Sequence, residues 1–115
     1  MTVATEQTWH WHVDVGADRR VLALSGEIDM SGVDRLDDLL HETIAQAGTV
    51  EIDLAGLTFI DSTVLSILVG AHHHAADRGV DLTLFNATGQ VRRILDMTGI
   101  MQLFGRGADP PPTAV

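Results

Sequence analysis

The sequence predicts a single α/β domain in which helices pack on a mixed sheet of four to five strands. Segments that alternate apolar and polar residues take turns with segments whose apolar residues recur every three or four positions. In addition, 115 residues with 45% apolar content suffice to bury one core. We expect the order strand, strand, helix, strand, helix, strand, helix, with the domain spanning residues 8–104.

Two strands open the predicted domain. Residues 9–15 alternate strictly, with the tryptophans and valines on one side and the histidines and Asp14 on the other, which is typical of a half-buried strand. Residues 20–25 form a second short strand, which we expect Gly26 to end. The turn-forming residues between the two segments predict a hairpin.

An amphipathic helix is predicted from Ser31. Its apolar stripe follows helical spacing, and the residues in it are Val33, Leu36, Leu40, Ile44 and Ala47. Ser31 with Asp34 resembles a capping arrangement at the start, and Gly48 is the expected stop.

The second half of the chain repeats the alternation of strand and helix. We expect a buried strand over residues 50–54, a loop over 55–60 and a helix that Asp61 or Ser62 opens and Gly79 ends. A strand over 80–85 and a helix over 88–99 complete the predicted domain. Residues 105–115 contain three consecutive prolines and little apolar content, which predicts a disordered tail.

Charge and composition exclude several classes of function. A net charge of -9 repels phosphate backbones and anionic lipid, so we expect no nucleic acid and no membrane as partner. The absence of cysteine and lysine excludes thiolate metal sites, cysteine nucleophiles and Schiff-base chemistry. No secretory signal is visible and the longest near-apolar stretch is too short to span a membrane, which predicts a cytoplasmic protein.

The histidines predict neither a metal site nor a catalytic centre. The run at 72–74 lies on a predicted helix, where two-point ligation needs residues four apart, and position 76 is alanine. No Gly-x-Ser-x-Gly motif surrounds Ser62, the most obvious serine. We therefore expect no catalytic residue, no metal and no cofactor. A small hydrolase that uses His10, His12 or Asp29 stays open as an alternative.

Three blocks of the sequence, in order, resemble the STAS domain, and most closely the bacterial anti-sigma factor antagonists. The first block is GEIDMSGVDRL at residues 26–36. The second is VEIDLAGLTFIDSTVLSILVG at 50–70, which carries an Asp-Ser pair between strand and helix. The third is the predicted final helix, at 91–99. The resemblance covers about residues 8–104 and implies a single STAS domain.

The resemblance implies a protein switch that acts in bacterial transcription and stress response. Ser62, or alternatively Thr63, would be phosphorylated by an anti-sigma factor that has a serine/threonine kinase (GHKL-type ATPase) fold. The unphosphorylated protein would bind that anti-sigma factor and free a sigma factor, and the phosphorylated form would let go. Asp29 and Asp61 would belong to the partner-facing surface.

The residues themselves are compatible with this role. A serine in the first helical turn lies beside free backbone N–H groups that can accommodate a phosphate, whose charge of about -1.5 to -2 would repel a partner. Ser66, Gly70 and His73 fall on the same helical side as Ser62, which predicts a partner-binding stripe. Helix capping by Asp61 and an ordinary solvent face for the stripe are the open alternatives.

One departure from the family pattern bears on phosphorylation. The family usually has glycine where this chain has Val64. A valine there either adds a core contact or alters the first helical turn. A STAS scaffold that is not phosphorylated and serves as an interaction module is therefore the second hypothesis, and we expect a monomer or weak dimer.

Overall fold

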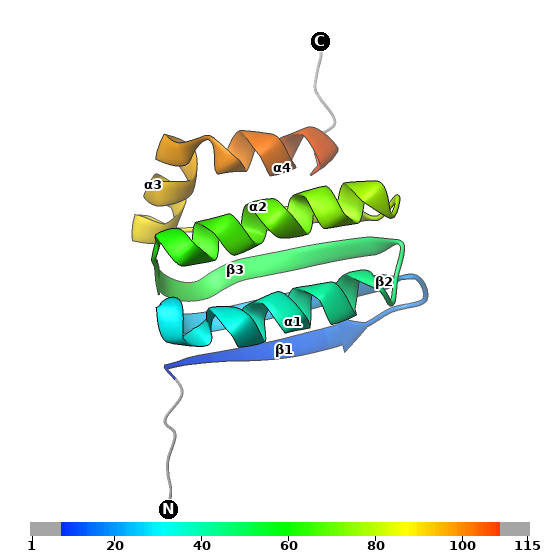
Figure 1. The fold of residues 1–115 in the computed structure, drawn as a ribbon, viewed down its shortest axis with the longest axis horizontal. Coiled ribbons are helices and arrows are strands. Elements are labelled where there is room, and N and C mark those ends of the chain that lie inside the picture. Colours follow the sequence, from blue (N-terminus) through cyan, green and yellow to red (C-terminus); the bar gives the residue numbers. More distant parts are fainter. Residues whose placement is uncertain (1–7, 109–115) are drawn as a thin grey trace, which may run out of the picture.

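The computed structural model describes residues 8–108, and α1 and α2 cover one face of its four-stranded sheet (Figure 1). The elements in chain order are β1 (Trp9–Val15), β2 (Arg19–Ile28), the short 3-10 helix η1 (Met30–Gly32), α1 (Val33–Ile44), β3 (Thr49–Ile60), α2 (Ser62–Asp77), β4 (Asp81–Phe85), α3 (Gly89–Thr98) and α4 (Ile100–Ala108).

The sheet is mixed, as predicted. Its strand order is β1-β2-β3-β4, with β1 antiparallel to β2 and with β2, β3 and β4 mutually parallel. Parallel neighbours require a crossover connection, and α1 and α2 provide the two that the sheet needs. The carboxyl ends of β2 and β3 consequently lie side by side at the same end of the sheet.

The hydrophobic core lies between the sheet and the helices. Alternate residues of each strand point into it, and the apolar stripe predicted for α1 supplies the opposing layer. Fully buried members of this core include Leu22, Ile28, Leu36, Leu40, Ile44, Ile52, Leu54, Ile60, Leu68 and Leu95. The opposite face of the sheet carries His10, His12 and Asp14 of β1, which are exposed, and the half-buried small and polar residues of β2 and β3.

Two strands are longer than the sequence pattern predicts. Gly26 does not end β2, because the strand passes through it at a φ of +95° and continues to Ile28. Residues 55–60, expected as a loop, belong to β3. Register shifts between Ala23 and Ser25 and between Gly26 and Glu27 interrupt the strict alternation, so this part of the chain lacks the pattern that predicts a strand.

Helix boundaries also differ from the prediction. Asp29, rather than Ser31 with Asp34, supplies the capping side chain before α1, and α1 ends at Ile44 instead of reaching Gly48. Thr88 and Gly99 bound α3 as expected, although the Thr88 side chain makes no capping hydrogen bond.

An unexpected helix follows α3. We predicted a tail from Gly105, but α4 runs from Ile100 to Ala108, and Phe104 within it is only 1% exposed. Residues 109–115 of the predicted tail lie outside the described part of the chain. No helix in residues 8–108 is both long and apolar enough to cross a membrane.

Candidate functional site

Two parallel strands bring two aspartates together at the end of the sheet where both strands stop. β2 and β3 end in register at Ile28 and Ile60. The next residue in each case is an aspartate, Asp29 before η1 and Asp61 before α2. Both carboxylates therefore belong to one surface, as the resemblance implies.

The two segments share the pattern Ile-Asp-x-Ser/Thr and the same local geometry. Asp29 Oδ1 accepts hydrogen bonds from the backbone N–H of Ser31 (3.0 Å) and from its hydroxyl (2.7 Å). Asp61 Oδ1 accepts from the backbone N–H of Thr63 (3.0 Å) and from its hydroxyl (2.5 Å). The second residue after each isoleucine, Met30 or Ser62, is left exposed.

Asp61 is held in its charged form. The hydrogen bond from the Thr63 hydroxyl is the main cause that lowers the pKa of Asp61, and bonds from the backbone N–H groups of Val64, Thr63 and Met30 add to it against the effect of desolvation. The bond from Met30 links the start of α2 to the start of η1. The site consequently carries a fixed negative charge beside Ser62.

Ser62 and Thr63 lie in different surroundings. The Thr63 side chain is half-buried and its hydroxyl caps the helix through Asp61. Ser62 is exposed, and among the described residues nothing hydrogen-bonds to its hydroxyl. Of the two, Ser62 is the one whose oxygen is available to an enzyme without loss of a structural contact.

The free backbone N–H groups expected beside Ser62 are largely occupied. The Asp61 carboxylate accepts from the N–H of Thr63 and, at 3.3 Å, from that of Val64. Because these donors already have an acceptor, the start of α2 does not offer them to a phosphate on Ser62. Such a group would project from the surface instead of folding back on the helix.

Val64 points away from this surface. Its side chain is 1% exposed and belongs to the core. The replacement of glycine by valine therefore adds a core contact, one of the two possibilities that the sequence left open, and places no bulk over Ser62.

The stripe predicted along α2 is exposed as a whole. Ser66, Gly70 and His73 all share the solvent side with Ser62. At 1.5 Å per residue, Gly70 lies about 12 Å and His73 about 16 Å along the helix from Ser62. Its geometry is thus confirmed, while its role in binding a partner stays a prediction.

Sequence reasoning missed Met30 and Ser31. Together with Asp29 and Asp61 they line an open depression of about 490 Å³ at the strand ends. Met30 is 66% exposed, which makes it an apolar side chain within an acidic rim. The repeated Ile-Asp-x-Ser/Thr pattern is the signal by which this pair of turns is recognisable.

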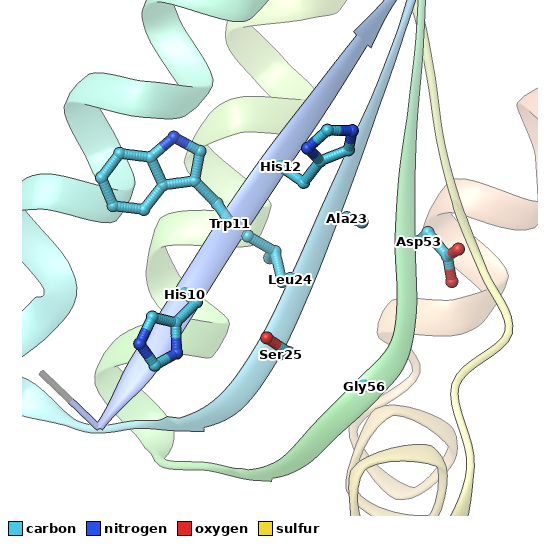
Figure 2. A pocket seen from close by; sticks show the side chains of 8 residues that line it. All are labelled: His10, Trp11, His12, Ala23, Leu24, Ser25, Asp53 and Gly56. Carbon is cyan, nitrogen blue, oxygen red and sulfur yellow. The ribbon is translucent and has the colours of Figure 1, made fainter.

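The residues of the hydrolase hypothesis do not meet in one pocket. His10 and His12 line a hollow of about 250 Å³ on the open face of the sheet with Ser25 and Asp53 (Figure 2). The Asp53 carboxylate already has hydrogen-bond partners there, since its Oδ1 accepts hydrogen bonds from Ala55 N and from Asn86 Nδ2. Asp29 lines the separate depression described above. Within residues 8–108, no group of three or more His, Cys, Asp or Glu is placed to hold a metal ion.

A family model described as "Mlab, STAS domain" matches residues 11–105 of this chain. The chain belongs to the STAS domain family. The anti-sigma-B factor antagonist of Listeria monocytogenes is 30% identical over 81 residues, which cover 70% of this chain and 71% of that protein.

Solved structures share the fold of this STAS domain. The crystal structure of an anti-sigma factor antagonist from Mycobacterium paratuberculosis superposes with a TM-score of 0.76 at 24% identity, over 89% of this chain and 87% of that one. The phosphorylated form of the Bacillus cell fate determinant SpoIIAA gives a TM-score of 0.66 at 18% identity, over 82% of this chain and 87% of that one.

Proposed function

We propose that this STAS protein is an anti-sigma factor antagonist. In its unphosphorylated form it binds an anti-sigma factor of serine kinase fold in the bacterial cytoplasm and so releases a sigma factor. Phosphorylation of Ser62 ends that binding. The observation that carries the proposal is the exposed Ser62 hydroxyl at the start of α2, next to Asp61, whose carboxylate caps that helix.

The accessibility of Ser62 supports phosphoryl transfer to this residue. Its oxygen is on the outside of α2 and has no structural role among the described hydrogen bonds, so a kinase reaches it without unfolding the helix. Thr63 would have to give up its bond to Asp61 before it could act as acceptor. We therefore expect Ser62 to be modified in preference to Thr63.

Charge explains how the modification would act. A phosphate brings about -1.5 to -2 charges next to the carboxylates of Asp29 and Asp61, on a chain whose net charge is already -9. The Asp61 carboxylate occupies the nearby backbone donors. The added charge consequently stays on the surface. There it repels a partner whose surface is acidic, and its bulk and hydration block close contact with a partner whose surface is not.

The modification should leave the fold intact. Ser62 makes no side-chain contact on which the core depends, and the residues that anchor this end of α2 are Asp61 and the buried Val64. Two names among the relatives agree with the proposed role, an anti-sigma-B factor antagonist and a determinant solved in a phosphorylated form. The switch would thus act at the surface alone.

The first test is phosphate mapping. The protein is incubated with its anti-sigma kinase and ATP, and the modified residue is identified by mass spectrometry. We expect phosphate on Ser62, none in Ser62→Ala, and normal incorporation in Thr63→Val, which keeps the side-chain shape. Loss of incorporation in Thr63→Val with full incorporation in Ser62→Ala would overturn the assignment.

The second test compares binding. Ser62→Ala should bind the anti-sigma factor even in the presence of ATP, and Ser62→Asp should bind weakly. Gln90→Glu adds the same charge in the first turn of α3, where Gln90 is exposed, and should leave binding unchanged. A complex that is indifferent to every Ser62 substitution would favour the unphosphorylated STAS scaffold instead.

A further inference from the structure

The amino-acid sequence of the edge strand β1 is complementary to a second copy of the same strand that runs antiparallel to it. β1 is the terminal strand of the sheet, and Figure 1 shows no described element beyond it. At the other edge β4 has five residues and packs against α4. β1 has seven residues in unbroken register with β2 and contains no proline, lysine or bulge, which are the usual devices that prevent edge pairing.

The backbone groups that point outward from β1 can be identified from its pairing with β2. The N–H of Glu27 donates to the carbonyl of Thr8, and the N–H of Gly16 donates to the carbonyl of Arg19, at the two ends of the pair. Bonded positions alternate along an antiparallel pair. Even-numbered residues of β1 therefore bond to β2, and the backbone groups of the odd-numbered residues face away from the sheet.

We propose that two copies of this chain pair antiparallel through β1, about a two-fold axis at His12. In this register Trp9 lies opposite Val15 of the partner subunit and Trp11 opposite Val13 of the partner subunit. These are the residues whose backbone groups point outward, so each pair exchanges hydrogen bonds. All seven residues of the strand are then paired, and the two sheets become one continuous sheet of eight strands.

Side chains on both faces match in the same register. On the open face His10 lies opposite Asp14 of the partner subunit, in a pair of the close, non-hydrogen-bonded type. On the helix face Val15, which is 71% exposed in the single chain, gains Trp9 of the partner subunit as a neighbour. A shift of the axis by one residue, to Trp11, leaves fewer residues paired and sets His10 against His12 of the partner subunit.

The charged groups around the axis set the conditions for pairing. Asp14 Oδ1 lies 3.0 Å from His12 Nε2 of its own chain, which leaves its second oxygen for His10 of the partner subunit. At the axis itself, His12 faces the same residue of the second copy. Above the helix face, Arg35 lies over the Trp11 ring beside Asp38 and Glu42, so the flank of α1 carries both signs of charge.

This dimer leaves the proposed switch free. Trp9 packs beside Gly32 of η1, so the start of β1 and the acidic depression lie at the same end of the molecule. The two-fold axis reverses the strand, which places the two Ser62 residues at opposite ends of the joined sheet. A dimer could thus engage two anti-sigma factors.

Sedimentation equilibrium of the full chain over a range of concentrations tests the proposal. We expect a dimer that dissociates on dilution. Val13→Pro removes an outward N–H and no bond to β2, so it should give a monomer with unchanged circular dichroism. A chain that stays monomeric up to about 1 mM, or a dimer that survives Val13→Pro, would overturn it.

A charge exchange tests the register without relying on proline. His10→Asp and Asp14→His should each raise the dissociation constant about tenfold, because like groups then face each other. The double change His10→Asp with Asp14→His should restore dimerisation. Asp81→His makes the same replacement at the far edge of the sheet, where Asp81 is exposed, and should have no effect. Failure of the double variant to recover would contradict the pairing about His12.

Hydrogen exchange provides a readout on the unaltered chain. The amides of Trp11 and Val13 point away from the sheet in the single chain and should exchange rapidly in dilute solution. They should become protected as the protein concentration rises. Protection that does not change with concentration, in a sample that sediments as a dimer, would place the interface elsewhere.

Discussion

The Asp61 carboxylate fixes the geometry on which the proposed switch depends. One of its oxygens accepts two backbone N–H groups and the Thr63 hydroxyl, which anchors the first turn of α2. This leaves the neighbouring Ser62 exposed, and its hydroxyl makes no hydrogen bond among the described residues. Asp61 thus serves as helix cap and as part of the acidic surface at once.

Removal of this cap should cost stability. We expect Asp61→Ala to lower the free energy of unfolding by about 1 kcal/mol, and Asp61→Asn, which keeps an acceptor oxygen, to lower it less. Asp34→Ala removes an exposed acid from the first turn of α1, where no capping bond is lost, and should cost only about 0.3 kcal/mol. Urea denaturation measures all three, and equal losses for Asp61→Ala and Asp34→Ala would refute the capping role.

The lowered pKa of Asp61 predicts the sign of a pH effect. A carboxyl whose pKa is lower in the folded than in the unfolded state stabilises the fold above its unfolded pKa of about 3.9 and loses that effect as the pH falls through the folded value. The stability difference between the native protein and Asp61→Asn should therefore be larger at neutral pH than in acid. Urea denaturation at several pH values checks this, and a difference that grows in acid has the wrong sign.

For single residues, the sequence predicts which side chains are exposed better than it predicts which hydrogen bonds they make. Helical spacing is sufficient to place Ser62, Ser66, Gly70 and His73 on one exposed side, because it depends only on local geometry. It does not show that Asp61 takes up the backbone donors, since that depends on a side-chain rotamer. Met30 was missed for another reason: its exposure follows from the capping turn at Asp29.

Among the secondary-structure elements, the extended β2 depends on a glycine. A side chain at Gly26 would place its Cβ 2.3 Å from the Thr8 carbonyl oxygen, at a φ of +95°. We expect Gly26→Ala to destabilise the protein by about 2 kcal/mol or more. Gly70→Ala, in the middle of α2 with nothing within 4 Å, should instead stabilise it by about 0.5–1 kcal/mol. Thermal unfolding distinguishes the two, and changes of the same sign would contradict the structure.

The unexpected helix α4 also has a measurable contribution. Phe104 is 1% exposed and lies edge-on to His72, with ring centroids 5.1 Å apart. We expect Phe104→Ala to cost about 3–5 kcal/mol, and Met97→Ala, at a position 77% exposed, to stay within about 0.5 kcal/mol. A loss below about 1 kcal/mol for Phe104→Ala, measured by urea denaturation, would mean that α4 does not pack on the core.

For the molecule as a whole, periodicity predicts the α/β class and most of the element order. Apolar residues recur every second position in the strands of this chain and every three or four positions in its helices. It fails in β2 and β3 beyond residues 25 and 54, where register shifts disturb the alternation. It also fails in α4, because the three consecutive prolines and the low apolar content of residues 105–115 predict a tail where the end of this helix lies. What no local pattern shows is that β2 and β3 are parallel neighbours, and this alone brings Asp29 and Asp61 together.

The central claim is that a phosphate on Ser62 abolishes partner binding without disturbing the fold. Isothermal titration of the anti-sigma factor with unmodified and with stoichiometrically phosphorylated protein tests it most directly, with circular dichroism to verify folding. The account predicts tight binding by the unmodified protein and at least about a hundredfold weaker binding, or about 2.7 kcal/mol, by the modified one. Equal affinities of the two folded forms would contradict it.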